Sequence, residues 1–203
     1  MKISTILYHL DHGRLALPCF ARDYVWNQTQ ARSLFISLYR GYPVGSLIFW
    51  TPAIAATDQQ VELREHVPVE LLLDGQQRVA SIYSVARARS PHFSKDDKRA
   101  LPPLYFHISD ETFDFFKPGM KDDPCWIDLA AFFSHSQTAV GEFIEALHES
   151  PAGHARLSEY LPRLYQLSRI LDRNIHVEYL PGDVQPDEAV EVYLVANGGG
   201  LRK

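Results

Sequence analysis

The segment Leu71-Leu72-Leu73-Asp74-Gly75-Gln76-Gln77-Arg78 changes from an apolar strand pattern to a helical pattern across a single Asp-Gly turn. Together with Val69, the three leucines suit a buried strand, and Val79 to Ala86 has the pattern of the following helix. A helix that starts after a strand and a glycine turn directs unpaired backbone N–H groups at any anion bound there. Arg78 would add a forked positive charge that matches phosphate.

A structural interpretation of the same residues is also open. Asp74 can serve as a helix N-cap, Gly75 as a turn residue, and Arg78 as the partner of a structural carboxylate. Strand-turn-helix junctions are common, so the segment alone allows either an anion site or a structural junction.

Composition sets the size and the class of the protein. A chain of 203 residues, 46% of them hydrophobic, is expected to form one domain with an ordinary core. A formal charge of -5 argues against a face that clamps duplex nucleic acid, because such a face concentrates Lys and Arg. A local basic pocket remains compatible, since the first eighty residues include Arg14, Arg22, Arg32, Arg40 and Arg78.

The cysteines, the histidines and the hydropathy predict neither a metal site nor a membrane segment. Cys19 and Cys125 are far apart in the sequence and lack a Cys-x-x-Cys partner, and the nine histidines show no His-x-x-x-His pair. No stretch has the pattern of a signal peptide or the length of a membrane span, so a cytoplasmic protein is expected.

Apolar periodicity predicts an α+β fold along the rest of the chain. A surface loop is expected over 52–68 and an exposed linker over 91–103. We expect a single domain over 1–203, with a core over about 1–110, the junction at 71–86 and a mainly helical part over about 120–203. Helices are predicted over 3–12, 29–39, 79–86, 126–133, 140–147, 155–171 and 188–195, and strands over 15–17, 46–51, 69–73, 104–108, 112–116 and 175–180.

Four blocks of the sequence resemble one protein family. Asp74 to Arg78 is similar to the DGQQR signature of the N-terminal domain of GmrSD-type, modification-dependent restriction proteins, also called domain-of-unknown-function family 262. Leu17 to Trp26 resembles the IPxFQRxYVW opening of that family, and Leu34 to Trp50 resembles its continuation. Glu191 to Leu201 is similar to its asparagine-glycine block. The order of the blocks also agrees.

The resemblance implies a ParB/sulfiredoxin-like core, a small mixed sheet with surrounding helices, in which nucleotide phosphates lie at the glycine turn. Gly75 would let the backbone approach a phosphate, and the amides near Gln76 and Gln77 would donate to its oxygens. Arg78 would neutralise charge, and Asp74 would position a metal or a water. The resemblance thus implies Asp74, Gln77 and Arg78 as catalytic residues.

Further nucleotide-binding residues follow from the other blocks. Arg22 is expected to be a second phosphate ligand, and Tyr24 and Trp26 to stack on a base, although large rings at such junctions also serve as core. Asn197-Gly198-Gly199 is expected to form a backbone nest for an anion, or else a flexible tail.

The function implied by the resemblance is a nucleotide-binding and NTP-hydrolysing sensor domain of an antiphage restriction system, with Mg²⁺ as cofactor. Modified DNA and a separate or C-terminal His-Asn-His nuclease module are the implied partners. The family pattern has Gln where this chain has Ala21, and Arg where it has Val195-Ala196, so binding is implied more strongly than hydrolysis. Two alternatives stay open: a DNA-binding or nicking module without its own nuclease, and a degenerate structural scaffold.

Overall fold

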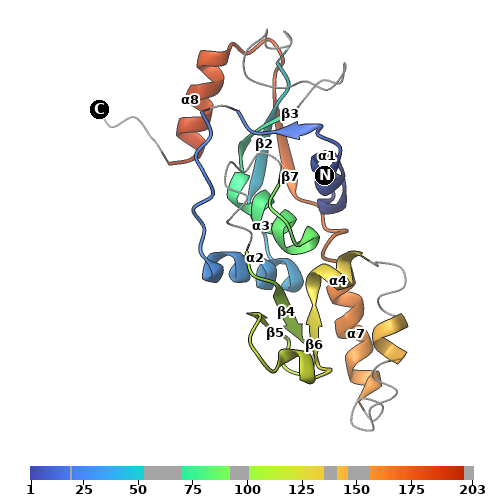
Figure 1. Cartoon of the computed structure of the whole chain (residues 1–203). Coiled ribbons are helices and arrows are strands. Elements are labelled where there is room, and N and C mark those ends of the chain that lie inside the picture. Colours follow the sequence, from blue (N-terminus) through green and yellow to red (C-terminus); the bar gives the residue numbers. More distant parts are fainter. Residues whose placement is uncertain (19, 53–69, 92–100, 135–140, 146–155, 199–203) are drawn as a thin grey trace.

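The chain forms two small sheets flanked by helices, with α2 and α3 lying between the sheets (Figure 1). The computed structural model describes residues 1–18, 20–52, 70–91, 101–134, 141–145 and 156–198. Residues 53–68 of the predicted loop and 92–100 of the predicted linker therefore lie outside the described residues. The elements in order are α1 (Ile3–Asp11), β1 (Leu15–Ala16), α2 (Gln28–Arg40), β2 (Ser46–Trp50), β3 (Glu70–Asp74), α3 (Gln76–Arg87), β4 (Leu104–His107), β5 (Thr112–Phe115), the 3-10 helix η2 (Met120–Asp122), β6 (Trp126–Asp128), α4 (Leu129–Ser134), α7 (Leu157–Ser168), β7 (His176–Leu180) and α8 (Pro186–Ala196).

The first sheet has the strand order β1-β3-β2-β7 and is mixed. Strand β3 pairs in parallel with β1 and antiparallel with β2, and β2 pairs in parallel with β7. The register between β2 and β3 shifts between Ile48 and Phe49, beside Asp74 at the end of β3. Because β7 belongs to this sheet, the C-terminal half is not purely helical: it supplies an edge strand next to β2.

The second sheet has the order β5-β4-β6, and both pairings are antiparallel. The predicted helix over 126–133 is wrong in its first three residues, which form β6 and pair with β4. Helix α4 starts at Leu129, directly after β6, because the Asp128 carboxylate accepts hydrogen bonds from the N–H groups of Ala130 (2.9 Å) and Ala131 (3.2 Å). A short aromatic and apolar run fits both periods, so its pattern did not separate strand from helix.

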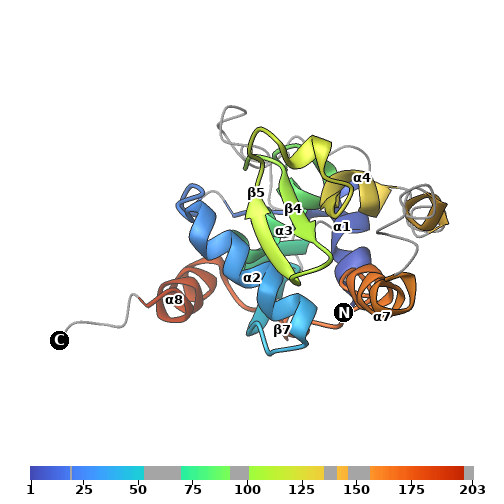
Figure 2. The ribbon, with the colours of Figure 1, turned by 90° about the horizontal axis from the view of Figure 1, so that it is seen from below.

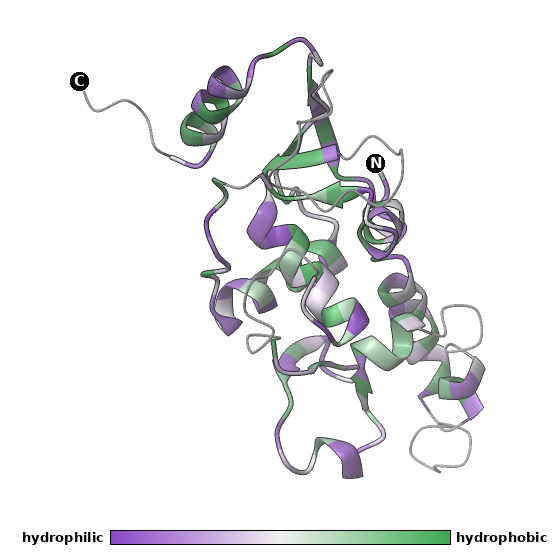
Figure 3. Ribbon diagram, turned by 45° about the horizontal axis from the view of Figure 1, so that its top comes forward, coloured by the Kyte–Doolittle hydropathy of each residue, from purple (hydrophilic) through white to green (hydrophobic). Residues whose placement is uncertain are grey.

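Helix α3 is the central helix of the fold. Ten of its twelve residues are buried, and its apolar residues follow a hydrophilic first turn (Figure 3). Helix α2 lies beside β5 of the second sheet (Figure 2). The rings of Phe35 on α2 and Phe113 on β5 are in contact there. One cluster of buried side chains therefore joins both sheets and α1, α2, α3, α4 and α7.

The helix ends follow the local chemistry of the sequence. Asn27 and Gln30 form a capping box at the start of α2, with both hydrogen bonds at 3.0 Å, and Gly41 ends the helix at φ +77°. The other predicted helices and strands are confirmed within a few residues at their ends, including the helical residues 141–145. No helix within the described ranges is long and apolar enough to cross a bilayer.

Candidate functional site

The strand-turn-helix junction forms where the sequence predicted it. Strand β3 ends at Asp74, Gly75 takes the left-handed conformation at φ +93°, and α3 begins at Gln76. Gly75 is the N-cap and no side chain caps the helix, so the N-cap interpretation of Asp74 is wrong. No described residue accepts a hydrogen bond from the backbone N–H groups of Gln76, Gln77 or Arg78. The first turn of α3 therefore keeps the unpaired donors that anion binding requires.

Gly75 is required by packing as well as by its turn conformation. A Cβ atom there would lie within 3.0 Å of Leu47 Cδ2 on β2, and the positive φ disfavours any side chain. The group that approaches the Gly75 backbone in this fold is the Leu47 side chain.

Arg78 makes the contacts of a structural arginine. Its Nη2 pairs with Asp74 Oδ2 at 3.1 Å, and its Nη1 donates to the Val44 carbonyl at 2.6 Å. The guanidinium also covers Gly45, where a Cβ would collide with Nη1. Only 16% of the side chain is exposed, so Arg78 fastens the segment before β2 to the start of α3.

The two glutamines are buried and contact the protein itself. Gln77 Oε1 accepts from the N–H groups of Val25 (2.8 Å) and Trp26 (3.2 Å), and its Nε2 donates to the Asp23 carbonyl (3.1 Å). Gln76 Nε2 donates to the Leu72 carbonyl at 3.2 Å, whereas no described group donates to its buried Oε1. Gln77 thereby ties residues 23–26 to the first turn of α3.

The loop held by Gln77 presents one unpaired cation. The backbone N–H of Arg22 donates to the Tyr193 hydroxyl on α8 at 3.0 Å, while its exposed side chain has no partner among the described residues. Tyr24 bonds Ser81 Oγ at 2.9 Å, and Trp26 packs against the main core. Burial raises the pKa of the Tyr24 hydroxyl. These positions favour a packing role for both rings.

The asparagine-glycine block also reaches the junction. Asn197 is the C-cap of α8, and its Nδ2 donates to the Tyr193 carbonyl (2.9 Å) and to the Leu73 carbonyl at the end of β3 (3.3 Å). Gly198 follows at φ +79°, and Gly199 lies outside the described residues. Three blocks that are far apart in sequence thus meet at the junction between β3 and α3.

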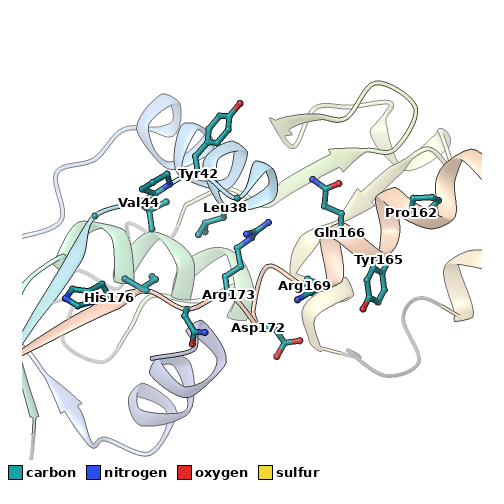
Figure 4. Close-up of a pocket in the computed structure, with 15 residues that line it drawn as sticks. Leu38, Tyr42, Val44, Pro162, Tyr165, Gln166, Arg169, Asp172, Arg173 and His176 are labelled. Atoms are coloured by element: carbon teal, nitrogen blue, oxygen red, sulfur yellow. The ribbon is translucent and has the colours of Figure 1, made fainter.

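A cleft beside this junction was not predicted. It measures about 810 Å³ and lies between the segment after α2 and the region from α7 to β7 (Figure 4). Val44, whose carbonyl binds Arg78, lines it, as do Arg169, Arg173 and the exposed Tyr165. Arg173 donates to the Tyr39 carbonyl at 3.1 Å but its buried Nε has no described partner. The apolar periodicity of 155–171 predicted a helix but gave no signal for a cleft beside α7.

The junction and its three converging blocks define an α+β domain built around a DGQQR turn. The chain matches the family model described as the GmrSD restriction endonuclease, N-terminal domain, over residues 3–202. The chain therefore belongs to this family, as the four blocks predicted, and membership implies a role in a restriction system. A search of curated proteins found no match.

Proposed function

We propose that this chain is a nucleotide-binding sensor domain of a restriction system, and that it holds nucleoside triphosphate phosphates at the first turn of α3. The observation that carries the proposal is that the Arg22 and Asn197 blocks both meet the junction between β3 and α3, the first through Gln77 and the second through the Leu73 carbonyl. The helix that starts at this junction retains three unpaired N–H groups.

The backbone supplies the first part of the anion site. The N–H groups of Gln76, Gln77 and Arg78 point along the helix axis, where the helix dipole favours negative charge. An unpaired buried donor costs about 1–3 kcal/mol, and phosphate oxygens accept from several such donors at once. Because the N-cap is a glycine, it has no side chain of its own to bind these donors, and no side chain in the described ranges binds them.

Side chains from the loop supply the charge. Arg22 contributes the free guanidinium, and the Tyr193 hydroxyl and Gln77 fix the backbone on either side of Asp23. Gln77 therefore acts as a positioning residue. Arg78 stays paired with Asp74, and its charge adds positive electrostatic potential at the first turn of α3.

We also propose that Mg²⁺ binds with the nucleotide and supports its hydrolysis. Mg²⁺ is commonly held by one or two carboxylates together with substrate phosphates. Asp74 fits this role, since only its Oδ2 is paired with Arg78 and the side chain is 23% exposed. The bound ion would neutralise phosphate charge, and Asp74 would orient it or a water.

Calorimetric titration with ATP, GTP, CTP and UTP in the presence of Mg²⁺ tests the proposal. We expect at least one to bind, and Arg22→Ala to weaken its affinity by about 10- to 100-fold, the equivalent of one charged hydrogen bond of 1.5–3 kcal/mol. Arg40→Ala is the matched control, because Arg40 is an exposed arginine without a described partner on another part of the surface. Absence of binding by all four nucleotides would overturn the proposal.

A second candidate is a junction that serves only the fold. The contacts of Arg78 with Asp74 and Val44, and of Leu47 with Gly75, favour it. It predicts that Arg78→Ala lowers the melting temperature and that neither Arg78→Ala nor Arg22→Ala changes any nucleotide affinity. The two candidates therefore differ in the outcome for Arg22→Ala.

A further inference from the structure

A cluster of possible metal ligands lies on the second sheet, away from the DGQQR junction (Figure 1). His107 ends β4, and Asp123 and Cys125 precede β6, the strand that pairs with β4. One donor atom from each of the three side chains lies within 4.8 Å of the other two, and His107 Nε2 is 3.5 Å from Asp123 Oδ2. None of the four family-like blocks includes these residues.

Backbone hydrogen bonds hold the cluster together. The Ile108 N–H donates to the Cys125 carbonyl at 2.9 Å, which fixes the end of β4 beside the turn. The Cys125 N–H donates to Asp123 Oδ1 at 2.9 Å, which leaves Oδ2 directed at His107. The sheet pairing and this turn thus set the spacing of all three donors.

The surroundings of His107 match those of a metal-binding histidine. Asp110 Oδ2 lies 3.0 Å from His107 Nδ1, at an angle that falls short of a hydrogen bond in the present rotamer. The Asp110 side chain is 65% exposed, and a proton held on Nδ1 by its carboxylate would leave the Nε2 lone pair facing Asp123. Metal-ligating histidines almost always donate their other N–H to such a carboxylate or carbonyl. The ring is 14% exposed and packs on Trp126, which restrains its orientation.

The charge of the cluster also favours a cation. Neither Asp110 nor Asp123 pairs with a lysine or arginine within the described part of the chain. The nearby Arg156 is committed elsewhere, because it binds Glu159 through two hydrogen bonds of 2.9 and 3.0 Å and Ser109 through one of 2.8 Å. A divalent ion would offset two of the three negative charges that two carboxylates and a thiolate bring together there.

We propose that His107 Nε2, Asp123 Oδ2 and Cys125 Sγ bind a zinc-class transition-metal ion, with water at the fourth position. Nitrogen, carboxylate oxygen and thiolate are the donors that zinc takes in proteins, whereas Mg²⁺ and Ca²⁺ prefer oxygen alone. Binding replaces the thiol proton, which leaves to solvent. The ion would join β4 to the segment that leads from β5 to β6 and so stabilise the second sheet.

Cobalt substitution tests the site directly. We expect the wild-type chain to bind one equivalent of Co²⁺ with a thiolate-to-cobalt charge-transfer band, and Zn²⁺ to displace it. Cys125→Ser should abolish the band, whereas Cys19→Ser, which alters the other cysteine, should retain it. No band in the wild type, or a band that depends on Cys19, would overturn the proposal.

Two further variants keep the test valid if Cys125→Ser fails to fold. Asp123→Asn alters a half-exposed side chain and should weaken Zn²⁺ affinity by at least 100-fold while circular dichroism stays unchanged. Asp110→Asn, which alters the residue behind His107, should weaken it by about 10- to 100-fold. Zn²⁺ should raise the melting temperature of the wild type and leave that of Asp123→Asn unchanged. Equal zinc affinity in wild type and Asp123→Asn would refute the assignment.

Discussion

Replacement of Gln77 by alanine should release the 23–26 loop from α3. The side-chain amide makes three hydrogen bonds to this loop, two to N–H groups and one to a carbonyl. A typical intramolecular hydrogen bond contributes about 0.5–1.5 kcal/mol net. Because Asp23 and Val25 are exposed, water replaces part of this bonding after the substitution. We therefore expect Gln77→Ala to lower the free energy of unfolding by about 2–4 kcal/mol, including the cavity that it leaves.

Urea unfolding followed by circular dichroism measures this change. Gln77→Glu is the informative companion, since its carboxylate keeps the acceptor for Val25 and Trp26 but loses the donor to Asp23, and it should recover part of the loss. Gln28→Ala, at an exposed position in the first turn of α2, should change stability by less than about 0.5 kcal/mol. A loss below about 0.5 kcal/mol for Gln77→Ala would refute the role of Gln77 as the tie between loop and helix.

Three other substitutions follow from the same geometry. Gly75→Ala should lower the free energy of unfolding by about 2–4 kcal/mol, because of the positive φ and the collision with Leu47. Gly13→Ala, whose new Cβ would meet nothing within 4 Å, should lose only the part due to the positive φ. Equal shifts of the two melting temperatures in differential scanning calorimetry would contradict this. Burial opposes ionisation of Asp11, but the hydrogen bond and charge of Arg87, with Tyr83 and Arg89, hold its pKa below the ordinary value. Because the folded-state pKa is lower, ionised Asp11 stabilises the fold at pH values above its unfolded-state pKa of about 3.9. This stabilisation is lost as the pH falls through the folded-state pKa. Asp11→Asn should therefore reduce the dependence of the unfolding free energy on pH at acidic pH. Tyr24→Phe removes the bond to Ser81 and should cost about 1 kcal/mol in urea unfolding without changing nucleotide affinity; an affinity loss of tenfold would instead assign the hydroxyl to the ligand.

The sequence predicted the local structure around residues 71–86 well because strand, turn and helix signals all lie within a few residues of one another. The left-handed Gly75 and the buried face of α3 follow from the same local pattern. The family blocks also indicated which distant segments meet at this turn, and the hydrogen bonds of Gln77 and Asn197 confirm their convergence.

The use made of each side chain was harder to predict. Gln77 and Arg78 are polar residues suited to a ligand. Apart from the local ion pair of Arg78 with Asp74, however, they bind backbone groups more than thirty residues away in sequence, among them those of Val25, Trp26 and Val44. Such pairings depend on the tertiary packing of β2 and the 20–26 loop on α3, which periodicity does not encode. The place of β7 beside β2, and the cleft next to it, depend on the same long-range packing.

The central claim is that nucleotide phosphates bind the first turn of α3, and backbone amide chemical shifts test it most directly. In an isotope-labelled sample titrated with the nucleotide that binds, the amide resonances of Gln76, Gln77 and Arg78 should shift most, together with Arg22, and Arg22→Ala should reduce the shifts at a given concentration. Saturable nucleotide binding that leaves these amides unchanged and instead shifts residues 169–176 along the neighbouring cleft would contradict the account.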